Sequence, residues 1–103
     1  MKRIGAEIRY DNAYQTALAE MELVNNRATK ERIDSVKELL KEMDRCITKI
    51  EQDFYGNPKI NKKDAENKVN NYRTQRKTLR QELETAELAF QQRELIKRAP
   101  ASS

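Results

Sequence analysis

The sequence contains no histidine and no tryptophan, and only one cysteine, two glycines and two prolines. The lack of histidine removes the most common general base and metal ligand near neutral pH. A single cysteine cannot form an internal disulfide, which favours a reduced, cytosolic setting. No apolar run is long enough for a signal peptide or a membrane span, so we expect any membrane anchor to lie outside these residues.

The remaining polar residues do not form a recognisable catalytic or metal-binding set. Cys46 has no histidine to pair with and lies beside an apolar helical stripe, so we expect a buried thiol. The carboxylate pairs Glu38/Glu42 and Glu84/Glu87 share a helix face, and on helices this charged they are expected to be solvated. No glycine-rich phosphate loop or zinc-binding spacing is present. We therefore predict a protein that is not an enzyme and uses no cofactor or metal.

The residues that are present are those of long helices. Charged and hydrophobic residues each make up 37% of the 103-residue chain, and turn-forming residues are few. This length predicts one domain, residues 1–98, followed by a polar tail or linker at 99–103. The formal net charge of +4 is a mild excess, which is a weak sign of nucleic-acid binding, and we expect none.

Hydrophobic residues recur every three or four positions in three segments, which predicts helices at about 6–25, 29–54 and 61–97. Asn26 or Thr29 can cap the second helix. Such stripes predict an all-α fold, an antiparallel up-down-up three-helix bundle with left-handed, coiled-coil-like packing and the third helix longest. The predicted core seam of the second and third helices consists of Ile33, Val36, Leu40, Met43, Ile47, Ile50, Phe54, Val69, Tyr72, Leu79 and Leu83.

The segment "DFYGNPKINKKD" (53–64) is predicted to be the corner between the second and third helices. Gly56 fits a left-handed position after a helix C-terminus, and Pro58 cannot continue a helix. Asn61 is a good N-cap for the third helix. That helix is expected to extend about 15 Å beyond the others, with Phe90, Leu95 and Ile96 on the extension. Its end is therefore expected to fold back, to continue into a further segment, to contact a partner or to self-associate.

The most prominent charged feature is a basic face on the third helix, formed by Arg73, Arg76, Lys77 and Arg80. Residues 59–80 hold eight basic and two acidic residues. One hypothesis is docking on an acidic protein surface or weak contact with anionic lipid headgroups. The alternative is a solvated face balanced by acidic residues of the neighbouring helices. Arg76 falls on the seam, where its apolar stem can follow the core edge.

Three stretches resemble the N-terminal regulatory (Habc-like) domain of Vti-type SNARE proteins. "RYDNAYQTALAEM" (9–21) looks like the first helix of that domain, "KELLKEMDRCI" (37–47) like the second, and "VNNYRTQRKTLRQELETAELAF" (69–90) like the third. "RELI" (93–96) is similar to the short segment that follows. The resemblance spans residues 9–96 in the same order. This chain ends before any SNARE motif with its central glutamine, and its Gly-Asn-Pro-Lys corner is longer than the family's usual link.

The resemblance implies a non-catalytic domain that regulates a SNARE in vesicle traffic and membrane fusion. It implies protein partners, namely other SNAREs and the ENTH domains of clathrin adaptors. It also implies a location on the cytoplasmic face of Golgi, endosomal or vacuolar membranes. Two alternatives stay open. "FYG" (54–56) resembles the turn of small secreted WXG-type helical hairpins, and a helical chaperone or scaffold subunit, such as a tubulin-folding cofactor, would share this composition.

Overall fold

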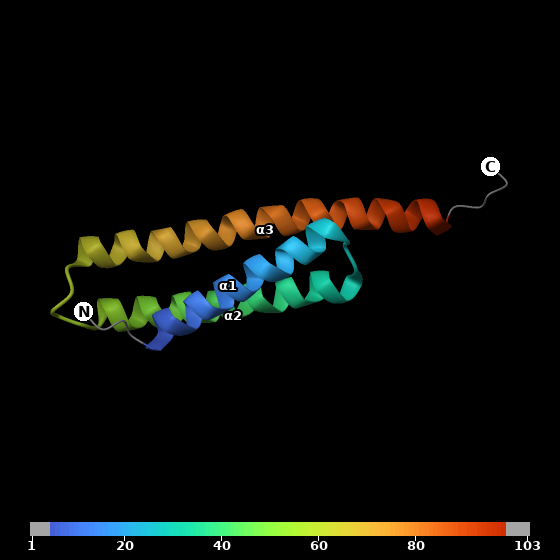
Figure 1. Cartoon of the computed structure of the whole chain (residues 1–103). Helices are drawn as coiled ribbons and strands as arrows, with labels where there is room; N and C mark the ends of the chain where they lie inside the picture. Colours follow the sequence, from blue (N-terminus) through green and yellow to red (C-terminus); the bar gives the residue numbers. More distant parts are fainter. Residues whose placement is uncertain (1–4, 99–103) are drawn as a thin grey trace.

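The computed structural model describes residues 5–98, which form three helices and no strand (Figure 1). Helix α1 spans Gly5–Asn26, α2 spans Lys30–Tyr55 and α3 spans Lys62–Arg98. Each helix reverses the direction of the previous one, and α3 is the longest at 37 residues. The predicted all-α three-helix fold is therefore confirmed, and each helix begins and ends one residue from the position predicted. The predicted tail at 99–103 lies outside the described residues.

The core is built from one stripe of each helix. All the predicted seam residues of α2 are buried, as are Val69, Leu79 and Leu83 of α3, while Tyr72 is half-buried. Helix α1 contributes several small residues, since Ala6, Ala13 and Ala17 are buried beside Tyr10 and Met21. Small side chains let α1 approach α2 closely, and α1 packs far more extensively on α2 than on α3.

Side chains satisfy the free backbone groups at the α1–α2 connection. The Thr29 hydroxyl accepts a hydrogen bond from the Arg32 N–H at 3.3 Å, which makes Thr29 the N-cap of α2. The Arg32 guanidinium donates to the Leu23 and Arg27 carbonyls, at 3.2 and 3.0 Å, and so caps the end of α1. Asn26, the other predicted cap, is the last residue of α1. One arginine thus joins the end of α1 to the start of α2.

Replacing the cap tests this local assignment. We expect Thr29→Ala to lower the free energy of unfolding by about 1 kcal/mol, because the Arg32 N–H loses its partner. Urea denaturation followed by circular dichroism measures the change. Thr29→Ser retains the hydroxyl and serves as the control. Equal stability of the alanine and serine variants would contradict a capping role.

The prediction of a left-handed Gly56 is wrong. Gly56 has φ −83° and ψ −5°, and no residue within 5–98 has a positive φ. The chain leaves α2 through right-handed turns instead, since the Asn57 N–H bonds the Phe54 carbonyl at 3.2 Å. The Asn57 side chain then accepts from the Lys59 N–H at 3.0 Å, an Asx turn across Pro58. Asn61 caps α3 as predicted, because its side chain accepts from the Lys63 N–H at 2.9 Å.

Candidate protein-docking site

The basic face of α3 is closely integrated with α2. The Arg76 side chain is only 25% exposed, and its Nε donates to the Leu40 carbonyl at 3.2 Å. The same Nε lies 3.7 Å from a carboxylate oxygen of Asp44. The apolar stem of Arg76 therefore lies at the core edge, and its charge is directed at α2. Arg76 acts as a tie between helices and presents little free charge to a partner.

The other residues of the basic face are on the surface, and most are neutralised. Arg73 pairs with Glu51 of α2, and Arg80 pairs with Glu84 of its own helix at 3.1 Å. Lys77 is exposed and forms no ion pair with any described residue. The structure thus brings the four residues together on α3, with Lys77 as the unpaired charge of the group. A docking role for this face remains a hypothesis.

The Cys46 thiol is buried, as the sequence predicted, and its Sγ donates to Glu42 at 3.6 Å. Burial raises the pKa of this thiol, and the adjacent Glu42 carboxylate raises it further. Glu42 also accepts from Arg45 at 2.9 Å, and this hydrogen bond lowers the pKa of the carboxyl. A buried, protonated thiol is a poor nucleophile.

The remaining members of the two carboxylate pairs take part in ion pairs. Glu38 pairs with Lys41 at 3.3 Å, and Glu87 pairs with Lys37 of α2 at 2.7 Å. The hydrogen bond to Glu87 raises the pKa of Lys37. Within residues 5–98, no group of three or more cysteine, aspartate or glutamate residues is placed to hold a metal ion.

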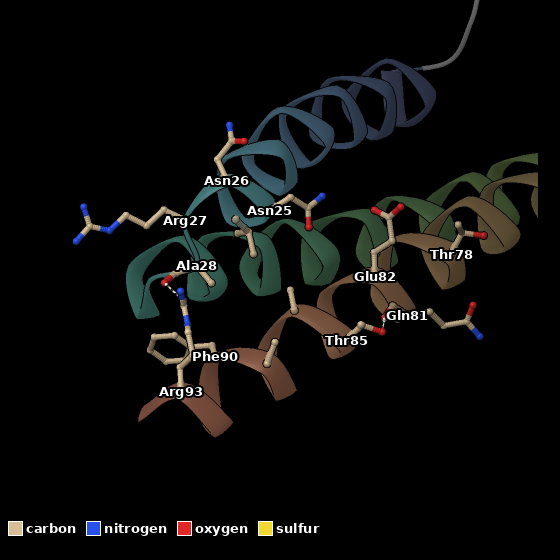
Figure 2. A pocket seen from close by; sticks show the side chains of 13 residues that line it. Asn25, Asn26, Arg27, Ala28, Thr78, Gln81, Glu82, Thr85, Phe90 and Arg93 are labelled. Carbon is tan, nitrogen blue, oxygen red and sulfur yellow. Dashed lines mark hydrogen bonds between the residues drawn. The ribbon is translucent and has the colours of Figure 1, made fainter. Parts of the chain in front are cut away.

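A groove of about 670 Å³ lies between the end of α1 and the second half of α3 (Figure 2). Its apolar lining includes Val24, Ala28, Ala86, Ala89 and Phe90. Val24 is buried, Ala28, Ala86 and Phe90 are half-buried, and Ala89 is exposed. Alanine side chains leave space that larger residues would fill. The groove is therefore open at the surface and lined by both apolar and polar side chains.

Polar side chains surround this hollow. Gln81, Glu82 and Thr85 line it from α3, and Asn25 lines it from the end of α1 (Figure 2). At the far end, the Arg93 guanidinium donates to the Ala28 carbonyl at 3.3 Å, beside the Phe90 ring. This bond ties α3 to the α1–α2 connection. Protein-docking sites combine apolar contact area with polar groups in this way.

At the opposite end of α1, a polar network connects α1 directly to α3. The Tyr10 hydroxyl lies 2.9 Å from the Tyr72 carbonyl and 3.0 Å from the Gln75 amide oxygen, and its one proton can serve either acceptor. The rings of Tyr10 and Tyr72 are 4.5 Å apart. The Tyr72 hydroxyl donates to Glu7 at 3.2 Å, and Lys68 Nζ lies 4.0 Å from the same carboxylate oxygen.

Two ionisable side chains of this network, Glu7 and Tyr10, are buried. Glu7 is 3% exposed, yet its carboxylate has both a hydroxyl and an ammonium partner. Desolvation raises the pKa of Tyr10 well above the usual range of a phenol, with Tyr14 and Tyr72 adding smaller effects. Every buried side-chain nitrogen or oxygen within 5–98 has a hydrogen-bond partner. The network thus secures α1 against α3 and leaves no described polar group unsatisfied.

Sequence reasoning missed both the groove and the network. Tyr72 was predicted to be a seam position, but its contacts with Tyr10 and Glu7 join residues more than 60 positions apart. A recognisable signal was Glu7, which lies one turn before Tyr10 on the same face. The small residues Ala86 and Ala89 indicated a loosely filled face, although the helix opposite them was unknown.

Comparison of the chain with protein-family models, with curated proteins and with solved structures found no match. Within residues 5–98, none of the three helices has both the length and the hydropathy needed to cross a membrane.

Proposed function

We propose that this chain is the regulatory, adaptor-docking N-terminal domain of a Vti-type SNARE protein that acts in intracellular vesicle traffic. The proposal combines the resemblance of residues 9–96 with the order of the helices. The stretches 9–21, 37–47 and 69–90 lie within α1, α2 and α3 respectively. The third helix is the longest. The observation that carries the proposal is this agreement between three resembling stretches and three consecutive antiparallel helices.

The chemistry of the described surface favours protein docking over catalysis. The buried thiol of Cys46 has a raised pKa, and the candidate carboxylates are paired with lysine or arginine. The groove of about 670 Å³ is lined by both apolar and polar side chains. We therefore assign the groove between α1 and α3 as the preferred docking place, with the ENTH domain of a clathrin adaptor as the partner.

The test measures binding of purified ENTH domains from clathrin adaptors to the chain by isothermal titration calorimetry. Ala89→Arg places a long charged side chain in the groove at an exposed position, so the fold should persist. We expect this change to weaken binding at least tenfold, a loss of about 1.4 kcal/mol or more. Thr48→Arg adds the same charge to an exposed position of α2 and should leave affinity unchanged.

Other results would place docking elsewhere on the chain or reject adaptor docking altogether. If Lys77→Glu weakens binding and Ala89→Arg does not, the partner uses the basic face. If no ENTH domain binds, adaptor docking fails. The proposed membership in a SNARE depends on the downstream reading frame, which should encode a heptad segment with a central glutamine or arginine and then about twenty apolar residues. A WXG-type hairpin has two long helices, so the three helices of this chain weigh against that alternative. The chaperone alternative predicts that the chain binds tubulin.

A further inference from the structure

A second hollow, of about 250 Å³, lies where the α1–α2 connection meets the last turns of α3. Four of the eight described residues that line it are basic, namely Arg27, Lys30, Arg93 and Lys97. Glu94 is the one acidic residue among the eight. The lining therefore holds three more positive than negative charges. We call it the basic hollow, and it is separate from the basic face of α3 described above.

Most of these positive charges are not neutralised. Arg27, Lys30 and Lys97 form no ion pair with any residue between 5 and 98. Arg93 donates one of its N–H groups to the Ala28 carbonyl at 3.3 Å, which leaves the other donors of its guanidinium available. On the basic face, by contrast, most of the positive charges have carboxylate partners. The excess charge of the basic hollow is thus available to a ligand.

Residues from distant parts of the sequence meet in this hollow. The bond to the Ala28 carbonyl holds the Arg93 guanidinium beside the Phe90 ring and the α1–α2 connection (Figure 2). Thr29 also lines the hollow. Its hydroxyl accepts from the Arg32 N–H, and no residue within 5–98 accepts its proton, so this proton is available to an anion. The hollow therefore combines positioned hydrogen-bond donors with positive charge.

Charge and size together define the ligand. A singly charged carboxylate would neutralise only one of the three excess charges, whereas a phosphate monoester carries about −1.5 to −2 at pH 7. Its oxygens also match the fork of an arginine guanidinium. A hollow of about 250 Å³ is slightly smaller than the pockets of about 300–1,000 Å³ that hold drug-sized molecules. The ligand is therefore small and carries more than one negative charge.

We propose that the basic hollow binds a phosphate group, either inorganic phosphate or the phosphate of a monoester. Arg93 and Thr29 donate hydrogen bonds to it, and Lys30 and Lys97 contribute charge. Glu94 opposes binding, because its carboxylate lines the same hollow. The site is assigned from the charges of this chain alone, so it does not depend on the proposed SNARE function.

Binding is measured by nuclear magnetic resonance titration of the whole chain with inorganic phosphate at constant ionic strength. Charges that are exposed to water attract an anion weakly, so we expect a dissociation constant on the order of 1 mM. The amide shifts of Ala28, Lys30 and Arg93 should change and saturate. Acetate at the same ionic strength should change them far less. Shifts that do not saturate, or that are equally large at Lys63, overturn the proposal.

Three variants test the assigned residues. Lys97→Gln should weaken phosphate binding about threefold, and Lys63→Gln removes the same charge from another exposed position of α3 and should leave it unchanged. Glu94→Gln should strengthen binding about twofold, because it removes a like charge. Equal effects of the two lysine variants, or no gain from Glu94→Gln, overturn the proposal. If circular dichroism shows that Lys97→Gln has lost helix content, Lys30→Gln replaces it.

A vesicle assay identifies the source of the phosphate. The chain is sedimented with vesicles of phosphatidylcholine alone or with about 10% phosphatidic acid, whose headgroup is a phosphate monoester. Binding that requires phosphatidic acid and is weakened by Lys97→Gln, but not by Lys63→Gln, assigns the hollow to a lipid headgroup. Saturable binding of inorganic phosphate without vesicle binding assigns it to a soluble phosphate or phosphate ester. Binding to neither probe overturns the proposal.

Discussion

Met43→Asp is expected to leave the chain largely unfolded at 25 °C. Met43 is fully buried at the middle of α2, and α2 is the helix that packs against both of the others. An aspartate there would place a carboxylate among apolar side chains with no partner. The expected loss is ~4 kcal/mol or more, a large part of the 5–15 kcal/mol that stabilises a typical domain. Loss of helical circular dichroism at neutral pH measures this result.

Two controls separate the effect of burial from the effect of substitution. Met43→Leu conserves volume and apolarity, so it should cost less than about 1.5 kcal/mol. Thr48→Asp adds the same carboxylate to an exposed position of α2 and should change stability by about 0.5 kcal/mol or less. If Met43→Asp unfolds cooperatively near the wild-type urea midpoint, Met43 does not occupy the core centre.

The second large effect is expected at Tyr10. Tyr10→Ala removes a ring that is 1% exposed and lies 4.5 Å from the Tyr72 ring, so we expect a loss of about 3–5 kcal/mol. Because α1 has few other contacts with α3, amide exchange near Tyr72 should accelerate more than exchange at the centre of α2. Urea denaturation and hydrogen exchange measure the two effects. Uniform acceleration across all helices would contradict a local clamp between α1 and α3.

Tyr10→Phe isolates the hydroxyl and predicts a dependence on pH. The folded-state pKa of Tyr10 is raised above its unfolded value of about 10, so the folded state favours the protonated phenol. Its contribution is fully present below about pH 10 and is lost as pH rises from there toward the folded-state pKa. Wild type should therefore lose more stability between pH 9 and pH 11 than Tyr10→Phe does. Parallel pH profiles of the two proteins would rule out this linkage.

The helices and their seams could be predicted from sequence because helical periodicity is a local signal. Ile33 to Phe54 repeat at spacings of three and four, and that repeat alone identifies the buried face of α2. The caps Thr29 and Asn61 were likewise recognisable, since a cap depends on residues three or fewer positions away. Gly56 was misassigned because a glycine permits a left-handed conformation without requiring one.

The candidate docking groove could not be predicted, because it depends on which faces of α1 and α3 meet. Ala86 and Ala89 form a hollow only because the end of α1 lies opposite them. The neutralisation of Arg73 depends in the same way on Glu51 of another helix. Contacts between residues far apart in the sequence cannot be predicted from hydrophobic periodicity or from local composition. The basic face therefore carries less free charge than the sequence alone indicates.

The position of α2 between two short connections also bears on how fast the chain folds. Residues 27–29 join α1 to α2, and residues 56–61 join α2 to α3. Most contacts therefore form between helices that are adjacent in sequence, which is the topology of domains that fold in microseconds to milliseconds. The bond from Tyr10 to the Tyr72 carbonyl spans 62 positions, so its closure carries the larger entropic cost. The α1–α3 clamp is thus expected to close last, after both hairpins have formed.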